Sequence, residues 1–139
     1  MDASAVWKNG LSFTGTGFTT GFSLPMGASP KVGGADDGFR PLELILVGLA
    51  GCTAMDVISI LEKKRQKVTA FEVKAHGDQA ESHPRGLTGF QLEYIVTGTA
   101  VDPEAVARAV ELSLEKYCSV TATLRKAGPI ESKITIREG

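Results

Sequence analysis

The sequence is poor in metal-binding residues and carries almost no net charge. Its 139 residues include two cysteines and two histidines, and fifteen basic residues against sixteen acidic ones give a net charge of −1. This balance disfavours nucleic-acid binding, which needs a basic excess, and supplies no polybasic segment for an anionic membrane. Because the cysteines and histidines are few and far apart, we expect neither a structural zinc site nor any other metal or cofactor.

Several motifs of chemistry and targeting are also missing. No C-x-x-C is present, which excludes a thioredoxin-like motif, and no G-x-S-x-G elbow indicates a serine hydrolase. The first seven residues lack the basic start and apolar stretch of a signal peptide. The uncharged run from Leu44 to Met55 is shorter than the ~20 residues that span a bilayer. We therefore expect a cytoplasmic protein without a membrane partner, in which a disulfide would more often be catalytic than structural.

The residues that are present indicate a single domain over residues 1–139. Apolar residues make up 42% of the chain, and its length is sufficient for one core. Alternation and helical periodicity predict three short strands near 5–8, 11–14 and 21–24, a helix over 41–64, strands over 71–76 and 90–96, a second long helix from Pro103 to the stop at Gly128, and a last strand over 130–137. Since hairpins join most of these strands, we predict an α+β fold with a mainly antiparallel sheet.

The helix over 41–64 is apolar on every side around Cys52. Gly48 and Gly51 lie inside it, where each costs about 1 kcal/mol relative to alanine, so we expect another backbone to approach closely there. A small sheet covers only one side of such a helix. We therefore expect a second copy of the chain to cover the other side in a symmetric homodimer.

Cys52 and Cys118 are the leading candidates for chemistry, although both could be inert buried side chains. In the chemical interpretation, a Cys52 thiolate attacks the O–O bond of a peroxide and becomes a sulfenic acid, with which Cys118 forms a disulfide. An external dithiol then reduces that disulfide. Such a thiolate needs a nearby cation or donor, held in turn by an acid. The candidates are Arg40, Arg85 and Lys116 for the cation and Glu43 for the acid.

Two motifs in this order resemble a known family. Gly48-Leu-Ala-Gly-Cys52 after Pro41, together with Glu115-Lys-Tyr-Cys118-Ser-Val, is similar to the OsmC/Ohr family of osmotically inducible and organic hydroperoxide resistance proteins. The resemblance implies an intertwined homodimer with an OsmC-like α+β fold and two central cysteine helices. It implies a thiol peroxidase that protects against oxidative stress by reducing organic hydroperoxides, with a dithiol such as a protein-bound dihydrolipoyl group as reductant. In this comparison Cys52 matches the peroxidatic cysteine and Cys118 the resolving one.

Two positions depart from the peroxidases of that family. Those enzymes place an arginine from the N-terminal strands at the thiolate, whereas residues 1–39 here contain no arginine. They also carry a glutamate directly after the proline that opens the helix, where this chain has Leu42 and then Glu43. The charged support of the thiolate is therefore either missing or rebuilt from Arg40 and Glu43. In this respect the sequence is most similar to the less characterised OsmC-like subgroup.

Three functions remain open at this point. The first is a homodimeric hydroperoxide reductase in which Cys52 attacks and Cys118 resolves. The second is a small-molecule-binding or thiol-carrier protein on the same fold, with little peroxidase turnover. The missing arginine favours this function. The third is a structural dimer with inert buried thiols.

Overall fold

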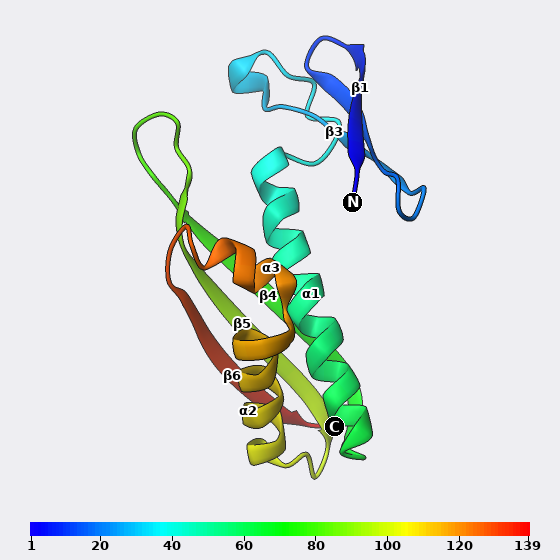
Figure 1. Ribbon diagram of the computed structural model, residues 1–139, viewed down its shortest axis with the longest axis vertical. Coiled ribbons are helices and arrows are strands. Elements are labelled where there is room, and N and C mark those ends of the chain that lie inside the picture. The colour runs from blue at the N-terminus through cyan, green and yellow to red at the C-terminus, as the bar shows by residue number, and fades with distance from the viewer. The chain divides into compact units, whose positions relative to one another are not determined.

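The apolar helix predicted around Cys52 is present as α1, which runs from Pro41 to Lys63 in a computed structural model that describes residues 1–139 (Figure 1). Within this helix the chain divides into two compact units, Met1–Ile45 and Leu46–Gly139. Each unit contains a three-stranded sheet of its own. The single domain expected from the sequence stays a prediction.

In the first unit, an antiparallel sheet has the order β1-β2-β3, formed by β1 (Ala3–Asn9), β2 (Ser12–Gly17) and β3 (Ser23–Met26). The turn between β1 and β2 contains Gly10 at φ +50°, a conformation that glycine adopts without steric penalty. The three predicted strands are thus confirmed. The glycine-rich loop that follows contains η1, a short 3-10 helix over Pro30–Val32.

In the second unit, β4 (Lys67–Gln79), β5 (Leu87–Thr99) and β6 (Ile130–Glu138) form a sheet in the order β4-β5-β6. β4 pairs with β5 antiparallel, whereas β6 pairs with β5 parallel. The parallel pairing differs from a hairpin because the chain passes through a helical segment between β5 and β6, starting with α2 (Pro103–Leu112). The α+β fold with mainly antiparallel strands is confirmed.

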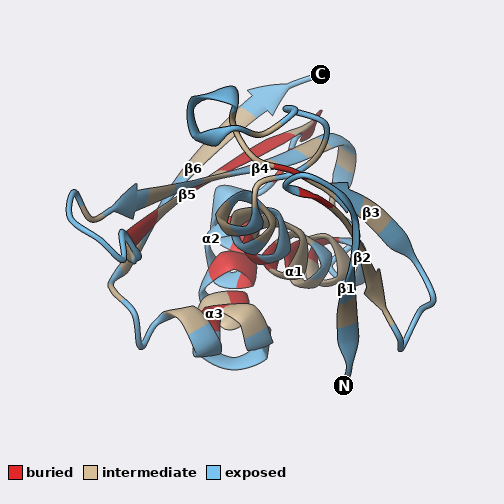
Figure 2. Cartoon of the chain, turned by 90° about the horizontal axis from the view of Figure 1, so that it is seen from above, coloured by how far each residue is buried: buried red, intermediate tan, exposed pale blue.

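The core of the second unit lies between this sheet and the helices, where Figure 2 shows buried residues gathered. α1 contributes one stripe of fully buried residues at every fourth position: Leu49, Thr53, Val57 and Leu61. The rest of α1 is largely uncovered, because only 22% of its most apolar 18-residue stretch is buried. By length and composition α1 could cross a membrane, a criterion that the core helices of soluble proteins also meet. Helix length therefore does not exclude a span, contrary to the expectation from the shorter uncharged run.

The second long helix is interrupted at Cys118, so the prediction of one continuous helix carrying this cysteine is wrong. α2 is followed by η2, a π-helical turn over Ser113–Tyr117, and then by α3 over Ser119–Leu124. Between them Cys118 is extended (φ −74°, ψ 105°) and caps α3 by accepting the N–H of Thr121 at its sulfur. The serine and threonines of this segment are poor helix formers, and side-chain acceptors compete with helical hydrogen bonds there.

Candidate active site

Cys52 lies at the middle of α1, with its sulfur facing the first turn of α3. Its side chain is half-buried. Its Sγ lies 3.9 Å from the Ser119 hydroxyl oxygen and accepts a hydrogen bond from the backbone N–H of Val120. The interruption at Cys118 creates this arrangement, because it turns the free N–H groups of a new helix toward α1.

Cys118 lies beside Cys52, although 66 positions separate the two in the sequence. The thiols are close enough for one to hydrogen-bond to the other, and both are free. Cys118 is only 3% exposed, and its Sγ accepts the backbone N–H of Thr121 at 3.3 Å. Its own N–H donates to the carbonyl oxygen of Ser113 at 2.8 Å, which fixes the backbone. The structure therefore brings together the two cysteines predicted from the sequence.

The two thiols differ in acidity. Partial burial raises the pKa of Cys52, but hydrogen bonds from Val120, Cys118 and Ser119 outweigh burial and lower the pKa below its ordinary value. Burial is also the main influence on Cys118, and together with the neighbouring Cys52 it raises the pKa of Cys118. The backbone N–H of Thr121, which is bonded to the sulfur, and the nearby Thr121 hydroxyl oppose this rise because both would favour a charged sulfur. In this pair Cys52 is therefore the more acidic thiol and Cys118 the less acidic one.

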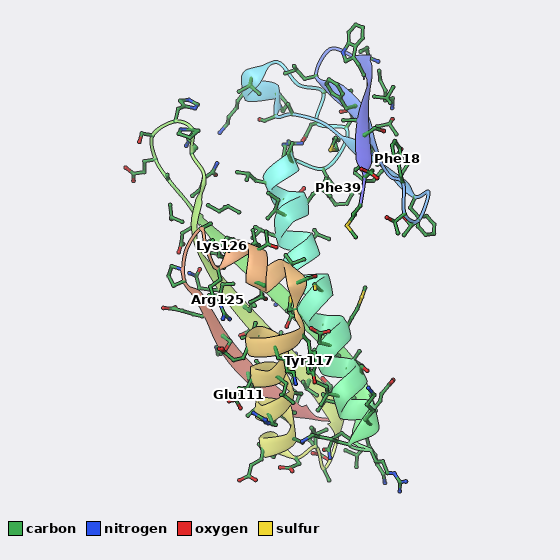
Figure 3. All side chains as sticks on the ribbon, viewed as in Figure 1. Phe18, Phe39, Glu111, Tyr117, Arg125 and Lys126 are labelled. Atoms are coloured by element: carbon green, nitrogen blue, oxygen red, sulfur yellow. The ribbon has the colours of Figure 1, made fainter.

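Hydrogen-bond donors, and no cation of the second unit, lower the pKa of Cys52. Asp56, one turn further along α1, raises the pKa of Cys52 by its negative charge. Lys116 lies 5.4 Å from the centre of the Tyr117 ring. Arg125 donates to the carbonyl of Leu114 at 2.7 Å and pairs with Glu115 at 3.6 Å; Figure 3 shows Tyr117 and Arg125. Arg85 lies in the connection between β4 and β5.

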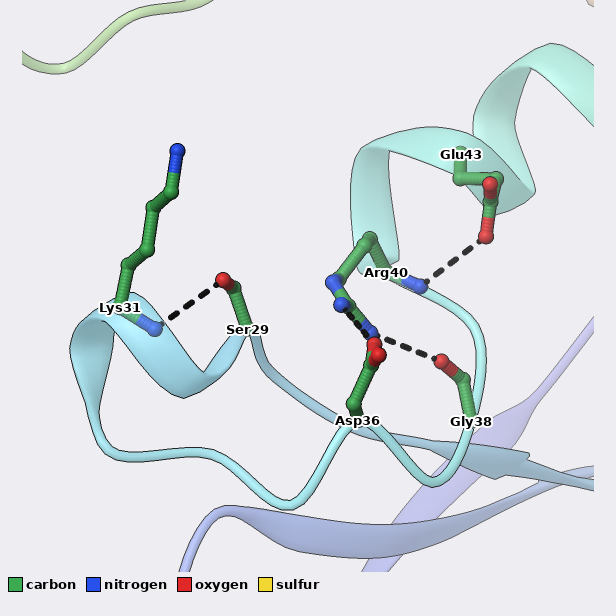
Figure 4. Close-up of polar contacts among 6 residues, drawn as sticks. All are labelled: Ser29, Lys31, Asp36, Gly38, Arg40 and Glu43. Atoms are coloured by element: carbon green, nitrogen blue, oxygen red, sulfur yellow. Dashed lines mark hydrogen bonds and ion pairs between the residues drawn. The ribbon is translucent and has the colours of Figure 1, made fainter.

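Arg40 and Glu43 belong to the first unit, where they contact each other through the backbone. The N–H of Arg40 donates to a Glu43 carboxylate oxygen at 3.4 Å. The Arg40 guanidinium instead pairs with Asp36 and donates to the carbonyl of Gly38 at 3.1 Å (Figure 4). The expected Arg40–Glu43 ion pair is therefore replaced by Arg40–Asp36, four residues apart. The assignment of Arg40 and Glu43 as catalytic residues stays a prediction.

A buried chain of hydrogen bonds that the sequence interpretation missed joins α1 to β5 and η2. The Thr53 hydroxyl lies 2.8 Å from that of Tyr94 and 2.7 Å from that of Ser113, which donates to Asp56 at 2.9 Å. Burial is the main reason that the pKa of Tyr94 rises to about 12, so its hydroxyl stays protonated. In the sequence, this hydrogen-bond chain could have been found from polar residues at helical positions that face the core, as at Thr53 and Ser113.

Thr121 is a second residue that the sequence interpretation missed. Its side chain is fully buried, and its hydroxyl makes no hydrogen bond in the reduced protein. Its backbone N–H nevertheless reaches Cys118 Sγ. No group of three or more His, Cys, Asp or Glu side chains lies together in a way that could hold a metal ion.

Comparison with known proteins identifies relatives along nearly the whole chain. The sequence model of the OsmC-like protein family matches residues 34–133. Protein YhfA of Escherichia coli strain K12 is 42% identical over 127 residues, which cover 91% of each chain.

Solved structures share the fold. A hypothetical protein from Aquifex aeolicus is 26% identical, with a TM-score of 0.86 and coverage of 99% of this chain and 96% of that one. An organic hydroperoxide resistance protein OsmC from Legionella pneumophila is 14% identical, with a TM-score of 0.72 and coverage of 96% and 95%. Because the family model spans most of the sequence and YhfA is 42% identical, the chain belongs to the OsmC-like protein family.

Proposed function

We propose that the protein is a cysteine-based peroxidase that reduces organic hydroperoxides, with Cys52 as the attacking residue and Cys118 as the resolving one. The observation that carries this proposal is the contact between two free thiols whose pKa values are shifted in opposite directions. The peroxide-related name of the Legionella structure supports the substrate class. We also propose a cytoplasmic location, where reduced thiols and a dithiol reductant are available.

The two cysteines perform a balanced sequence of steps. The Cys52 thiolate attacks the hydroxyl oxygen of the hydroperoxide, the O–O bond breaks, and the alkoxide takes a proton from water and leaves as an alcohol. Cys52 is then a sulfenic acid. The Cys118 sulfur attacks the sulfenic sulfur, its proton and the hydroxyl group leave as water, and a disulfide forms. A dithiol restores both thiols by thiol–disulfide exchange.

The same proposal includes a homodimer, as is typical of OsmC/Ohr proteins. In the single chain Val47 is 53% and Met55 is 72% exposed on α1. A Cβ added to Gly48 or Gly51 would meet nothing within 4 Å, so these glycines are not needed for packing within one chain. A second copy against this face of α1 would bury both exposed side chains and account for both glycines.

Stopped-flow oxidation of the reduced protein by cumene hydroperoxide tests the activity. The parent protein is expected to oxidise rapidly, and Cys52→Ser to lose the reaction because serine is not ionised at neutral pH. Cys118→Ser serves as the matched control, since it should oxidise once and stop at the sulfenic acid. Oxidation of Cys52→Ser as fast as the parent would show that the proposal is wrong.

A ligand-binding or thiol-carrier function is the second candidate, favoured by an open apolar groove of about 450 Å³ in the first unit. Its lining includes Phe22, Leu24, Met26 and Leu44. Native mass spectrometry of the purified protein would support this function if an apolar small molecule stays bound while peroxide turnover is slow. Rapid turnover with a dithiol would exclude the carrier function.

A further inference from the structure

We infer that an external dithiol attacks the Cys52 sulfur of a Cys52–Cys118 disulfide, and that Thr121 stabilises the Cys118 thiolate that leaves. The inference rests on the disulfide of the proposed function.

In the single chain, the two cysteines differ in their exposure to solvent. Cys52 is half-buried, whereas Cys118 is 3% exposed. A second chain on α1 would reduce the exposure of both cysteines and could not uncover Cys118. Since an attacking thiolate must approach one sulfur from the side opposite to the leaving sulfur, Cys52 is the atom that a reductant can reach.

Acidity alone would favour the reverse direction, because the thiol with the lower pKa leaves more readily. Burial raises the pKa of Cys118, and so do the charge of Cys52 and its hydrogen bond. Both contributions from Cys52 disappear once its sulfur is bound in a neutral mixed disulfide. Burial is then opposed by Thr121, whose backbone N–H and hydroxyl each lower the pKa of Cys118.

The Thr121 hydroxyl provides an independent indication of this role. It is fully buried and without a hydrogen-bond partner in the reduced protein, which is unfavourable for a polar group. A negatively charged sulfur at Cys118 is a far stronger acceptor than a neutral thiol. The hydroxyl is thus positioned for a charge that forms during the reaction and is absent at rest.

One thiolate of the dithiol forms a bond to Cys52 Sγ, the bond between the two cysteine sulfurs breaks, and its electron pair goes to Cys118 Sγ. The second thiol of the dithiol loses its proton and attacks the dithiol sulfur bound to Cys52. This attack releases the Cys52 thiolate and an oxidised dithiol, and Cys118 takes up a proton.

The experiment compares variants of the intact protein after its disulfide has been formed with diamide, so that no peroxide turnover is required. Thr121→Val removes the hydroxyl and retains the side-chain shape, and Thr121→Ser restores a hydroxyl. Thr123→Val is the matched control, because the Thr123 hydroxyl donates to the carbonyl of Ser119 at 2.8 Å and not to a cysteine. The measured quantities are the rate of reduction by dithiothreitol and, separately, the rate of oxidation by cumene hydroperoxide.

We expect Thr121→Val to slow reduction about tenfold relative to oxidation, since it removes a hydrogen bond to a charged group. Thr121→Ser should recover most of the loss, and Thr123→Val should match the parent. After a brief reaction with 2-mercaptoethanol and acid quenching, peptide mass mapping should place the adduct on Cys52.

Three results would overturn the inference: parent-like reduction of Thr121→Val, an adduct on Cys118, or failure of diamide to join the two cysteines. If the parent reacts slowly with peroxide but the reduction results are as expected, the inference holds and the peroxidase proposal fails. The two failures are therefore distinguishable.

Discussion

Thr53 and Thr121 are both fully buried, yet their hydroxyls have opposite surroundings. The Thr53 hydroxyl hydrogen-bonds to Tyr94 and Ser113, whereas that of Thr121 makes no hydrogen bond. Thr121→Val is expected to raise the free energy of unfolding by about 1 kcal/mol, because it removes an unpartnered buried hydroxyl. Thr53→Val should lower it by about 1–3 kcal/mol, because two buried hydroxyls lose a partner. Urea unfolding of both variants checks this, and changes of the same sign would contradict it.

Asp56 opposes the acidity of Cys52, although burial opposes it more strongly. Its negative charge raises the pKa of Cys52, so Asp56→Asn is expected to lower this pKa further and to move the thiolate titration to lower pH. Ultraviolet absorbance of the thiolate, followed against pH, measures the shift. Glu111→Gln is a suitable control, because Glu111 pairs with Arg108 on the exposed side of α2. A titration of Asp56→Asn that is unchanged, or that moves to higher pH, would refute the assignment.

For single residues, the sequence is sufficient to identify the two cysteines but not the groups that surround them. Cys52 and Cys118 are the only thiols, so few alternatives exist. The expected cation near Cys52 rested on counting charged residues. In the second unit backbone and hydroxyl donors replace it, and these follow from the break at Cys118, which residue propensities do not locate.

The junction between η2 and α3 depends on a sulfur atom that caps a helix. Serine is among the best residues at such a position. Cys118→Ser is therefore expected to retain the stability of the parent, whereas Cys118→Ala should lose about 1 kcal/mol. Thermal and urea unfolding of the reduced proteins compares them. Equal stability of the two variants would show that the Thr121 N–H does not depend on this cap.

Elements with strong periodicity were predicted well, and those set by tertiary contacts were not. The two long strands agree with prediction because their apolar residues alternate. α1 agrees because its apolar run is too long for a strand. The parallel pairing of β6 with β5 was missed, since pairing direction depends on the path of the intervening helices. The turn at Ser113–Tyr117 was missed because its residues continue the helical periodicity of α2.

The uncovered face of α1 leads to a prediction for the whole molecule. Met55 is 72% exposed in the single chain, so Met55→Glu should leave the folded chain intact but place a charge in the proposed dimer interface. We expect the variant to sediment as a monomer where the parent sediments as a dimer. Glu62→Gln, on an exposed part of the same helix, is the control. Dimeric Met55→Glu would argue against this face.

The capping role of the Cys118 sulfur links the oxidation state of the protein to its backbone. A disulfide requires the Cys118 sulfur to move to bonding distance of Cys52, about 2.05 Å, and this movement competes with its hydrogen bond to the Thr121 N–H, which is 3.3 Å long in the reduced protein. Oxidation should therefore loosen the first turn of α3 and expose its amides to faster hydrogen exchange. The same turn donates to Cys52 through Val120. The exchange rates of the amides in this turn would thus indicate whether the protein is in its reduced form, ready to react with peroxide, or in its oxidised form, ready to react with a reductant.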